Sequence, residues 1–177
     1  MYKTWQFLLV MLVSGLFTGL IAFVVYLGLL SFGTQIFSPA NLLIYFVPFI
    51  GMWIAAVRLR NRYNYRMLSF GQGFRISFST GFLSAVVFSV MVYYMFSGLF
   101  ESLLNARINA LVGQLVLDNP SLGLDELNNR KELVHRMLAP LSQAVYFFAF
   151  NFVLLPVWAF LIAIFVRKRG RILNEDD

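Results

Sequence analysis

The chain has 177 residues, of which 60% are hydrophobic and only 12% are charged. Soluble domains carry roughly 25% charged and 45–50% apolar residues, so this composition excludes a water-soluble globular protein and indicates an integral membrane protein. The absence of cysteine excludes disulfides and thiol chemistry, and the net charge of +6 has to be judged from where the basic residues lie.

The first predicted membrane span covers about residues 5–30. No charged side chain occurs between Lys3 and Arg58, and this stretch is far longer than the apolar core of a cleavable signal peptide. The stretch therefore predicts two retained helices joined by a turn, with the second helix over about residues 40–57.

The first two spans contain residues that are expected to shape helix packing. Gly15 and Gly19 make a G-x-x-x-G step, and in lipid such small residues let two helix backbones approach closely. We therefore expect these glycines to form a helix contact. Within the second span, Pro48 removes one backbone hydrogen bond and is expected to kink the helix.

A basic link without any acidic residue follows the second span. Its basic residues are Arg58, Arg60, Arg62, Arg66 and Arg75. Short links rich in arginine stay on the cytoplasmic side, so these residues are predicted to set the topology and to contact anionic lipid head groups. A narrower alternative is a specific site for one anionic head group or an acidic partner. The link is too short to favour nucleic-acid binding, and no nucleic-acid partner is expected.

The third predicted span, about residues 74–98, organises the rest of the chain. Small residues recur at every fourth position along it, and no charge separates Arg75 from Glu101. This ladder of small residues consists of Gly73, Ser77, Gly81, Ala85 and Ser89. A spacing of four places them on one slowly drifting helix face, which predicts the surface on which the other helices pack.

Residues 99–139 predict an amphipathic helical hairpin between the third and fourth spans. Apolar residues recur at helical spacing from residue 99 to residue 115, and the segment 118–123 then breaks the helix. The second helix, about residues 125–138, contains the i,i+4 pairs Glu126–Arg130 and Glu132–Arg136. This hairpin either lies on the outer membrane surface or projects from it.

The last predicted span covers about residues 141–166. Asn151 lies near its middle, where an amide usually forms a hydrogen bond with a neighbouring helix. A contact between this amide and a transported substrate is the alternative. Pro156 predicts a kink.

The basic residues predict the topology. If both termini are cytoplasmic, the inner segments hold Lys3, five arginines within 58–75 and four basic residues within 167–171, which is ten in all. The outer hairpin holds four basic residues against five acidic ones. The positive-inside rule therefore places both termini in the cytoplasm. The expected fold is an all-α integral membrane protein, a four-helix transmembrane bundle over residues 1–177 as a single membrane domain.

The start of the third span carries a resemblance to a known family. Ser69, Phe70, Gly71, Phe74 and Arg75 fit the pattern S-F-G-x-x-F-[KR]. With four spans, an arginine-containing second link and a charged amphipathic third link, the chain resembles domain-of-unknown-function family 4199. Members of this family are small membrane proteins seen mainly in Bacteroidota. The resemblance implies a bacterial inner-membrane setting, and it implies no activity and no catalytic residues.

Catalysis is not expected from this sequence. His135 is the single histidine, and Glu132 one turn before it lacks the second histidine or paired carboxylate of a metal site. We therefore predict no catalytic residue, no metal and no cofactor.

Two function classes remain open. The first is a non-enzymatic membrane subunit or scaffold that binds a protein partner or a second copy through the membrane helices and the outer hairpin. The second is a small transporter or oligomeric channel. It is weakened because transport sites usually place ionisable residues at mid-membrane, and the predicted spans have none there.

Overall fold

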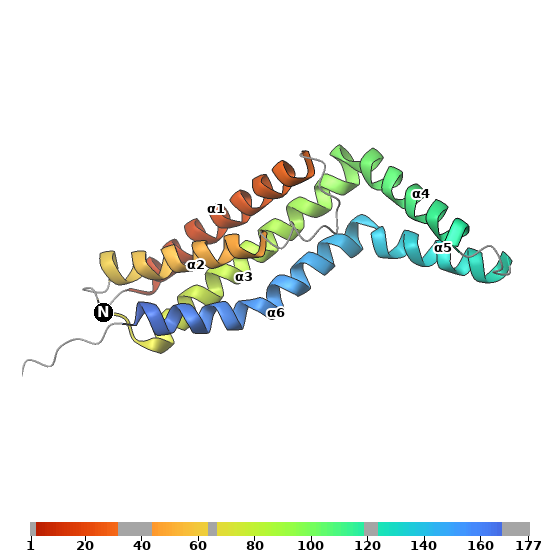
Figure 1. Ribbon diagram of the computed structural model, residues 1–177. Helices are drawn as coiled ribbons and strands as arrows, with labels where there is room; N and C mark the ends of the chain where they lie inside the picture. The colour runs from red at the N-terminus through yellow and green to blue at the C-terminus, as the bar shows by residue number, and fades with distance from the viewer. Residues whose placement is uncertain (1–2, 32–43, 64–66, 119–123, 168–177) are drawn as a thin grey trace, which may run out of the picture. The chain divides into compact units, whose positions relative to one another are not determined.

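The computed structural model describes residues 3–31, 44–63, 67–118 and 124–167, and nearly all of them are helical (Figure 1). The predicted all-helical fold is therefore confirmed. The elements in chain order are α1 (Thr4–Ser31), α2 (Phe46–Arg58), η2 (Leu59–Tyr63), α3 (Phe70–Tyr94), η3 (Met95–Leu99), α4 (Glu101–Asp118), α5 (Leu124–Leu138) and α6 (Pro140–Val166). The short elements η2 and η3 are π-helical and continue α2 and α3.

Three helical stretches are long and apolar enough to cross a membrane. They are Thr4–Ser31, Phe70–Gly98 and Pro140–Val166, close to the predicted spans 5–30, 74–98 and 141–166. Helix α2 has 13 residues. It therefore measures roughly 20 Å, whereas the hydrocarbon core of a bilayer is roughly 30 Å thick. The first residues of the predicted span 40–57 lie outside the described part of the chain.

Pro48 does not lie in the middle of a helix as the sequence suggested. Helix α2 begins at Phe46, so Pro48 is in its first turn. The first backbone N–H groups of a helix have no partner within the helix, so the missing N–H of proline costs little there. The predicted kink at Pro48 is therefore wrong.

The chain forms two compact units. The first consists of Met1–Phe88 and Phe150–Asp177, and the second of Ser89–Ala149. The first unit holds α1, α2 and the parts of α3 and α6 up to residue 88 and from residue 150. The second unit holds the remaining parts of α3 and α6 with the α4–α5 hairpin.

Within the first unit, α1 and α3 run in the same direction. The Arg75 guanidinium lies over the Phe7 ring at 6.0 Å from its centroid. A β-carbon on Gly15 would lie 2.9 Å from the Leu83 side chain, and one on Gly19 would lie 2.7 Å from the Val87 side chain. In these three contacts the α1 residue meets the residue 68 positions later, which shows that the two helices are parallel. Further along, Tyr26 meets Phe88, so the register changes towards the end of α1.

Helices α2 and α6 run opposite to this pair. Gly73 and Gly81 near the start and middle of α3 meet Ala163 and Leu155 respectively, so α6 is antiparallel to α3. Aromatic contacts join α2 and α6 along their length as a parallel pair. They are Tyr45–Phe150 at 4.4 Å, Phe49–Trp158 at 5.1 Å and Trp53–Phe165 at 6.2 Å between ring centroids.

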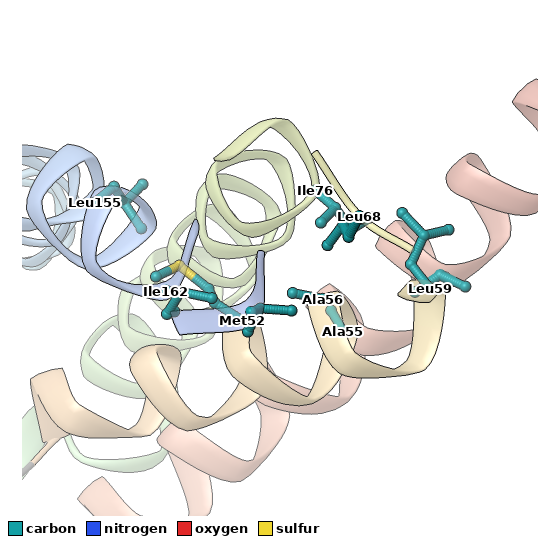
Figure 2. Close-up of a cluster of buried hydrophobic side chains, with 10 residues drawn as sticks. Met52, Ala55, Ala56, Leu59, Leu68, Ile76, Leu155 and Ile162 are labelled. Atoms are coloured by element: carbon teal, nitrogen blue, oxygen red, sulfur yellow. The ribbon is translucent and has the colours of Figure 1, made fainter. Parts of the chain in front are cut away.

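All four helices of the first unit contribute to one hydrophobic core cluster (Figure 2). Its members are Val10, Met52, Ala55, Ala56, Leu59, Leu68, Ile76, Leu155, Ile162 and Val166. The α2 members Met52, Ala55 and Ala56 face the neighbouring helices, with Ile162 of α6 beside Met52 in this view. Two alanines on this face allow α2 to lie close to its neighbours.

A capping box starts α3. The Ser69 backbone N–H donates a hydrogen bond to Gln72 Oε1 at 3.1 Å, and the Gln72 N–H donates one to Ser69 Oγ at 3.3 Å. This reciprocal pair satisfies two backbone donors that the first helical turn would otherwise leave open. The helix consequently begins at Phe70, four residues before the predicted start of the span.

The second unit contains the hairpin of α4 and α5. Leu104 and Ile108 of α4 and Leu138 of α5 are buried. Both predicted i,i+4 ion pairs form, Arg130–Glu126 at 2.7 Å and Arg136–Glu132 at 2.6 Å. Because these pairs are exposed, each contributes only a few tenths of a kcal/mol, roughly 0.3–0.5 kcal/mol.

Side chains of α6 close the end of α5 within the same unit. Ser142 Oγ donates a hydrogen bond to the Arg136 carbonyl at 2.7 Å, and Gln143 Nε2 donates one to the Met137 carbonyl at 3.0 Å. The last carbonyls of a helix have no intrahelical donor, so these two side chains supply the missing partners. The α5–α6 junction is thereby held by specific hydrogen bonds.

Candidate functional site

Buried polar side chains gather in the first unit, whose interior is otherwise apolar. They come from α1, α3 and α6 and comprise Ser14, Thr18, Ser77, Thr80, Ser84 and Asn151. We call this set the polar layer. Burying polar groups costs free energy unless they find hydrogen-bond partners, so a gathering of this kind requires a reason.

Three members of the polar layer lie near the middle of their apolar stretches, whereas Ser77 lies about 10 Å before Ser84 along α3. Thr18 is near the middle of Thr4–Ser31, and Ser84 is at the middle of Phe70–Gly98. Asn151 is one turn before Leu155, which meets Gly81 of the antiparallel α3. Asn151 is therefore level with the turn of α3 that follows Gly81, where Ser84 lies. Thr18, Ser84 and Asn151, from three helices, thus lie about halfway along the apolar stretches.

The hydroxyl of Thr18 is satisfied within α1. Thr18 Oγ1 donates a hydrogen bond to the Ser14 carbonyl at 2.6 Å. The same side chain lies against Gly51 of α2, where an added β-carbon would collide with Thr18 Oγ1. Gly51 therefore lets α2 approach the polar layer closely.

The α3 hydroxyls behave differently. Ser77, Thr80 and Ser84 each have 0% relative exposure. Their side-chain oxygens have no hydrogen-bond partner in the part of the chain that the structure describes. A buried donor or acceptor without a partner costs roughly 1–3 kcal/mol per group. These three residues are the main unexplained polar groups of the first unit.

The pattern of hydroxyls and small residues in α3 repeats one in α1. Ser14-Gly15 and Thr18-Gly19 correspond to Thr80-Gly81 and Ser84-Ala85, at a constant separation of 66 residues. All eight of these residues are buried. Of these eight, only Gly15, Gly19, Gly81 and Ala85 are predicted from the sequence, as packing positions, and the four hydroxyl residues beside them are not. The repeat was the signal that could have shown the polar layer.

The predicted ladder on α3 lies along the inside of the first unit as far as Ala85. A β-carbon on Gly73 would lie 3.3 Å from the Ala163 Cα, and one on Gly81 would collide with Leu155 and Met52. Ser77 and Ala85 are buried on the same face. The last member, Ser89, is buried in the second unit. Gly15 and Gly19 of α1 contact the larger side chains Leu83 and Val87 of α3. Each of these contacts therefore pairs a small residue with a large one.

The predicted basic cluster is spread over the end of the first unit. Arg58, Arg62 and Arg75 are exposed, and Arg66 lies outside the described residues. The guanidinium of Arg60 donates a hydrogen bond to the Val166 carbonyl at 3.2 Å. Arg60 thus satisfies a carbonyl at the C-terminus of α6, where a positive charge is also favourable.

The S-F-G-x-x-F-R motif anchors the start of α3. Ser69 forms the capping box, and the Phe70 ring contacts Phe160 of α6 at 5.6 Å between centroids. Phe74 stacks on Phe78 at 5.9 Å, and Arg75 lies over Phe7 of α1. The motif therefore fixes α3 against its neighbours, and the aromatic and basic residues act in packing.

The family comparison agrees with this motif. The family described as Protein of unknown function (DUF4199) matches residues 13–168. The chain belongs to this family. No curated protein and no solved structure matches it. The DUF4199 match covers α2, α3 with its motif, the α4–α5 hairpin and α6, and it extends over most of α1.

Four charged residues of the hairpin form two exposed ion pairs, and Arg107 and Lys131 are half-buried. Glu132 forms its ion pair with Arg136, and His135 is exposed on the same helix. Across residues 3–31, 44–63, 67–118 and 124–167, no group of three or more His, Asp or Glu side chains could hold a metal ion. The chemistry that the described residues offer is hydrogen bonding by neutral hydroxyls and amides in the polar layer, and basic contacts at one end.

Proposed function

We propose that the chain is a non-enzymatic subunit or scaffold of the bacterial inner membrane. It crosses the bilayer four times as a four-helix bundle and binds a partner protein or a second copy through its membrane helices and the α4–α5 hairpin. The exposed apolar side chains of the hairpin carry this proposal.

The direction of the helices supports four crossings. Helices α1 and α3 are parallel and both are long enough to span a membrane. The chain has to return to the starting side between them, and α2 is the described helix in that segment. It runs antiparallel to α1 and α3. Residues 44 and 45, which precede α2, are buried and extend its apolar length.

The same directions support a common side for both termini. Helix α6 is antiparallel to α3, so its C-terminal end lies beside the N-terminal ends of α1 and α3. Exposed Arg58, Arg62, Arg75 and Arg167 lie at that end. The positive-inside rule makes it the cytoplasmic end, and exposed arginines there are placed to contact anionic lipid head groups.

The hairpin exposes large apolar side chains although it also carries most of the acidic residues. The exposed apolar side chains are Leu103, Val116 and Leu117 on α4, and Leu133 and Met137 on α5. Leu117 is 79% exposed. Leu133 and Met137 are four positions apart and therefore share one helix face. In an extramembrane element, such side chains are typical of a surface that another molecule covers.

Paired variants of α5 test this role. Leu133→Gln with Met137→Gln removes the apolar face, and Asn128→Gln with Asn129→Gln is the control because both asparagines are exposed and remain amides. The chain and each variant are purified from native membranes into nanodiscs and weighed by native mass spectrometry. We expect a stoichiometric partner or a second copy with the unmodified chain and the control, and its loss with the apolar variant. A lone monomer in all three preparations would contradict the proposal.

A small transporter or oligomeric channel is the second candidate, because the polar layer lies halfway along the spans. Transport sites commonly lie near the middle of the bilayer. Reconstituted vesicles loaded with neutral polar solutes or with salts give the test. Flux above that of empty vesicles, reduced by Thr80→Val, is the expected result for a transporter. Equal leakage with and without protein would remove this candidate.

A further inference from the structure

We propose that the face of α3 carrying Ser77, Thr80 and Ser84 binds water molecules inside the first unit, as a hydrated polar site at mid-depth. The proposal concerns the interior of the unit and holds for a scaffold as well as for a transporter. Its basis is three fully buried hydroxyls on one helix face, none of which has a hydrogen-bond partner among the described residues.

Serine and threonine hydroxyls on helices usually find a hydrogen-bond acceptor within their own helix. They can donate to the carbonyl three or four positions earlier. Thr18 does so with Ser14 at 2.6 Å, and Ser31 does so with Leu27 at 2.8 Å. Ser77, Thr80 and Ser84 make no such bond. Among the described residues, their hydroxyls therefore lack the backbone partner that Thr18 and Ser31 have.

The spacing of the three residues suits bridging water. Ser77 and Thr80 are three positions apart, and Thr80 and Ser84 are four apart, so all three share a face. Neighbours at these spacings are about 5–6 Å apart at Cβ, which is too far for a direct hydrogen bond. Two O–H···O bonds of about 2.8 Å through one water cover that distance.

The chemistry of the surroundings favours a neutral ligand. Between Ile76 and Gly98, and along α1 and α6, the sequence has no charged side chain that could balance an ion. Water donates and accepts equally well, as hydroxyls do, and buried water typically needs two to four polar partners. The Asn151 amide and the Thr18 side chain lie at the same depth and enlarge the polar surroundings.

Oxidation of the Met52 side chain can be used to detect water at this face. Its sulfur lies at Gly81, where it occupies the space of a β-carbon. Ser77 lies one turn before Gly81 and Ser84 one turn after it, on the same face. Met52 is 0% exposed, and Met95 in the second unit is 1% exposed. The two methionines are thus equally hidden from bulk solvent. Met52 packs at Gly81, between Ser77 and Ser84, whereas Met95 follows Ser84 by eleven residues.

X-ray radiolysis of the full chain in nanodiscs tests the proposal directly. Hydroxyl radicals formed from a bound water oxidise the side chains beside it, and mass spectrometry measures oxidation at each methionine. We expect Met52 to be oxidised several-fold faster than Met95. The triple variant Ser77→Ala, Thr80→Val and Ser84→Ala should reduce oxidation of Met52 several-fold and leave Met95 unchanged. Oxidation of Met52 no faster than that of Met95, or unchanged in the triple variant, would overturn the proposal.

The sign of a stability change gives a second readout if the triple variant does not fold. Ser84→Ala removes one hydroxyl, and Ser79→Ala on another face of α3 is the control. A hydroxyl bonded to water stabilises the fold, so Ser84→Ala is expected to lower the thermal midpoint in detergent by a few degrees more than the control does. A dry, unpartnered hydroxyl predicts a raised midpoint, and that result would overturn the proposal.

Discussion

The sulfur of Met52 on α2 stands where a β-carbon of residue 81 on α3 would have to lie. Leu155 of α6 occupies the same space from the other side. One glycine therefore lets two neighbouring helices approach α3 at the depth of the polar layer.

Gly81→Leu tests this close approach. Four additional carbons at a full site force backbone shifts, so we expect a loss of at least about 3 kcal/mol or a failure to fold. Phe82→Leu is the control because Phe82 is exposed, as is Phe152, whose ring it contacts. Its cost should stay below about 1.5 kcal/mol. Thermal midpoints and elution profiles in detergent give both values, and equal behaviour of the two variants would contradict the packing described for α3.

Arg60 is predicted to stabilise the fold, unlike its neighbour Arg58. Arg60→Ala removes the donor to the Val166 carbonyl, which should cost about 1 kcal/mol. Arg58→Ala changes the net charge equally but removes an exposed side chain, so it should cost less than about 0.5 kcal/mol. The comparison of thermal midpoints checks this. A similar loss in both variants would show that charge, and not the hydrogen bond from Arg60 of η2 to α6, sets the effect.

Ser69→Ala is predicted to weaken the start of α3. The variant removes the side chain that accepts from the Gln72 N–H, and a lost N-cap typically costs about 1 kcal/mol. Ser69→Asp should restore stability because a carboxylate accepts the same bond and suits the positive end of the helix dipole. Hydrogen exchange at the first turn of α3 measures the effect. Unchanged protection in Ser69→Ala would contradict the capping box.

The sequence predicted the long helices well because each of them is an uninterrupted run of apolar residues. The apolar runs alone placed α1 and α6 within a residue or two of their ends. The predicted start of the second span near residue 40 lies outside the described residues, and Pro48, expected well inside that helix, lies in the first turn of α2.

The pairing of helices and the polar layer lay beyond the sequence analysis for a different reason. Which face meets which depends on three-dimensional packing, so the contact of Gly15 with Leu83 has no local signature. Ser77 and Ser89 were counted for their small size. Their oxygens gain importance only once burial has removed water as a partner.

Impermeant maleimide labelling of single cysteines tests the four crossings most directly, since the chain has no cysteine of its own. The variants Lys3→Cys, Asn61→Cys and Asn129→Cys place a thiol at exposed positions before α1, in η2 and on α5. In intact spheroplasts we expect labelling of the cysteine at position 129 alone, with the other two labelled only after permeabilisation. If positions 61 and 129 are labelled from the same side, or positions 3 and 61 from opposite sides, the chain does not cross the membrane four times in this order.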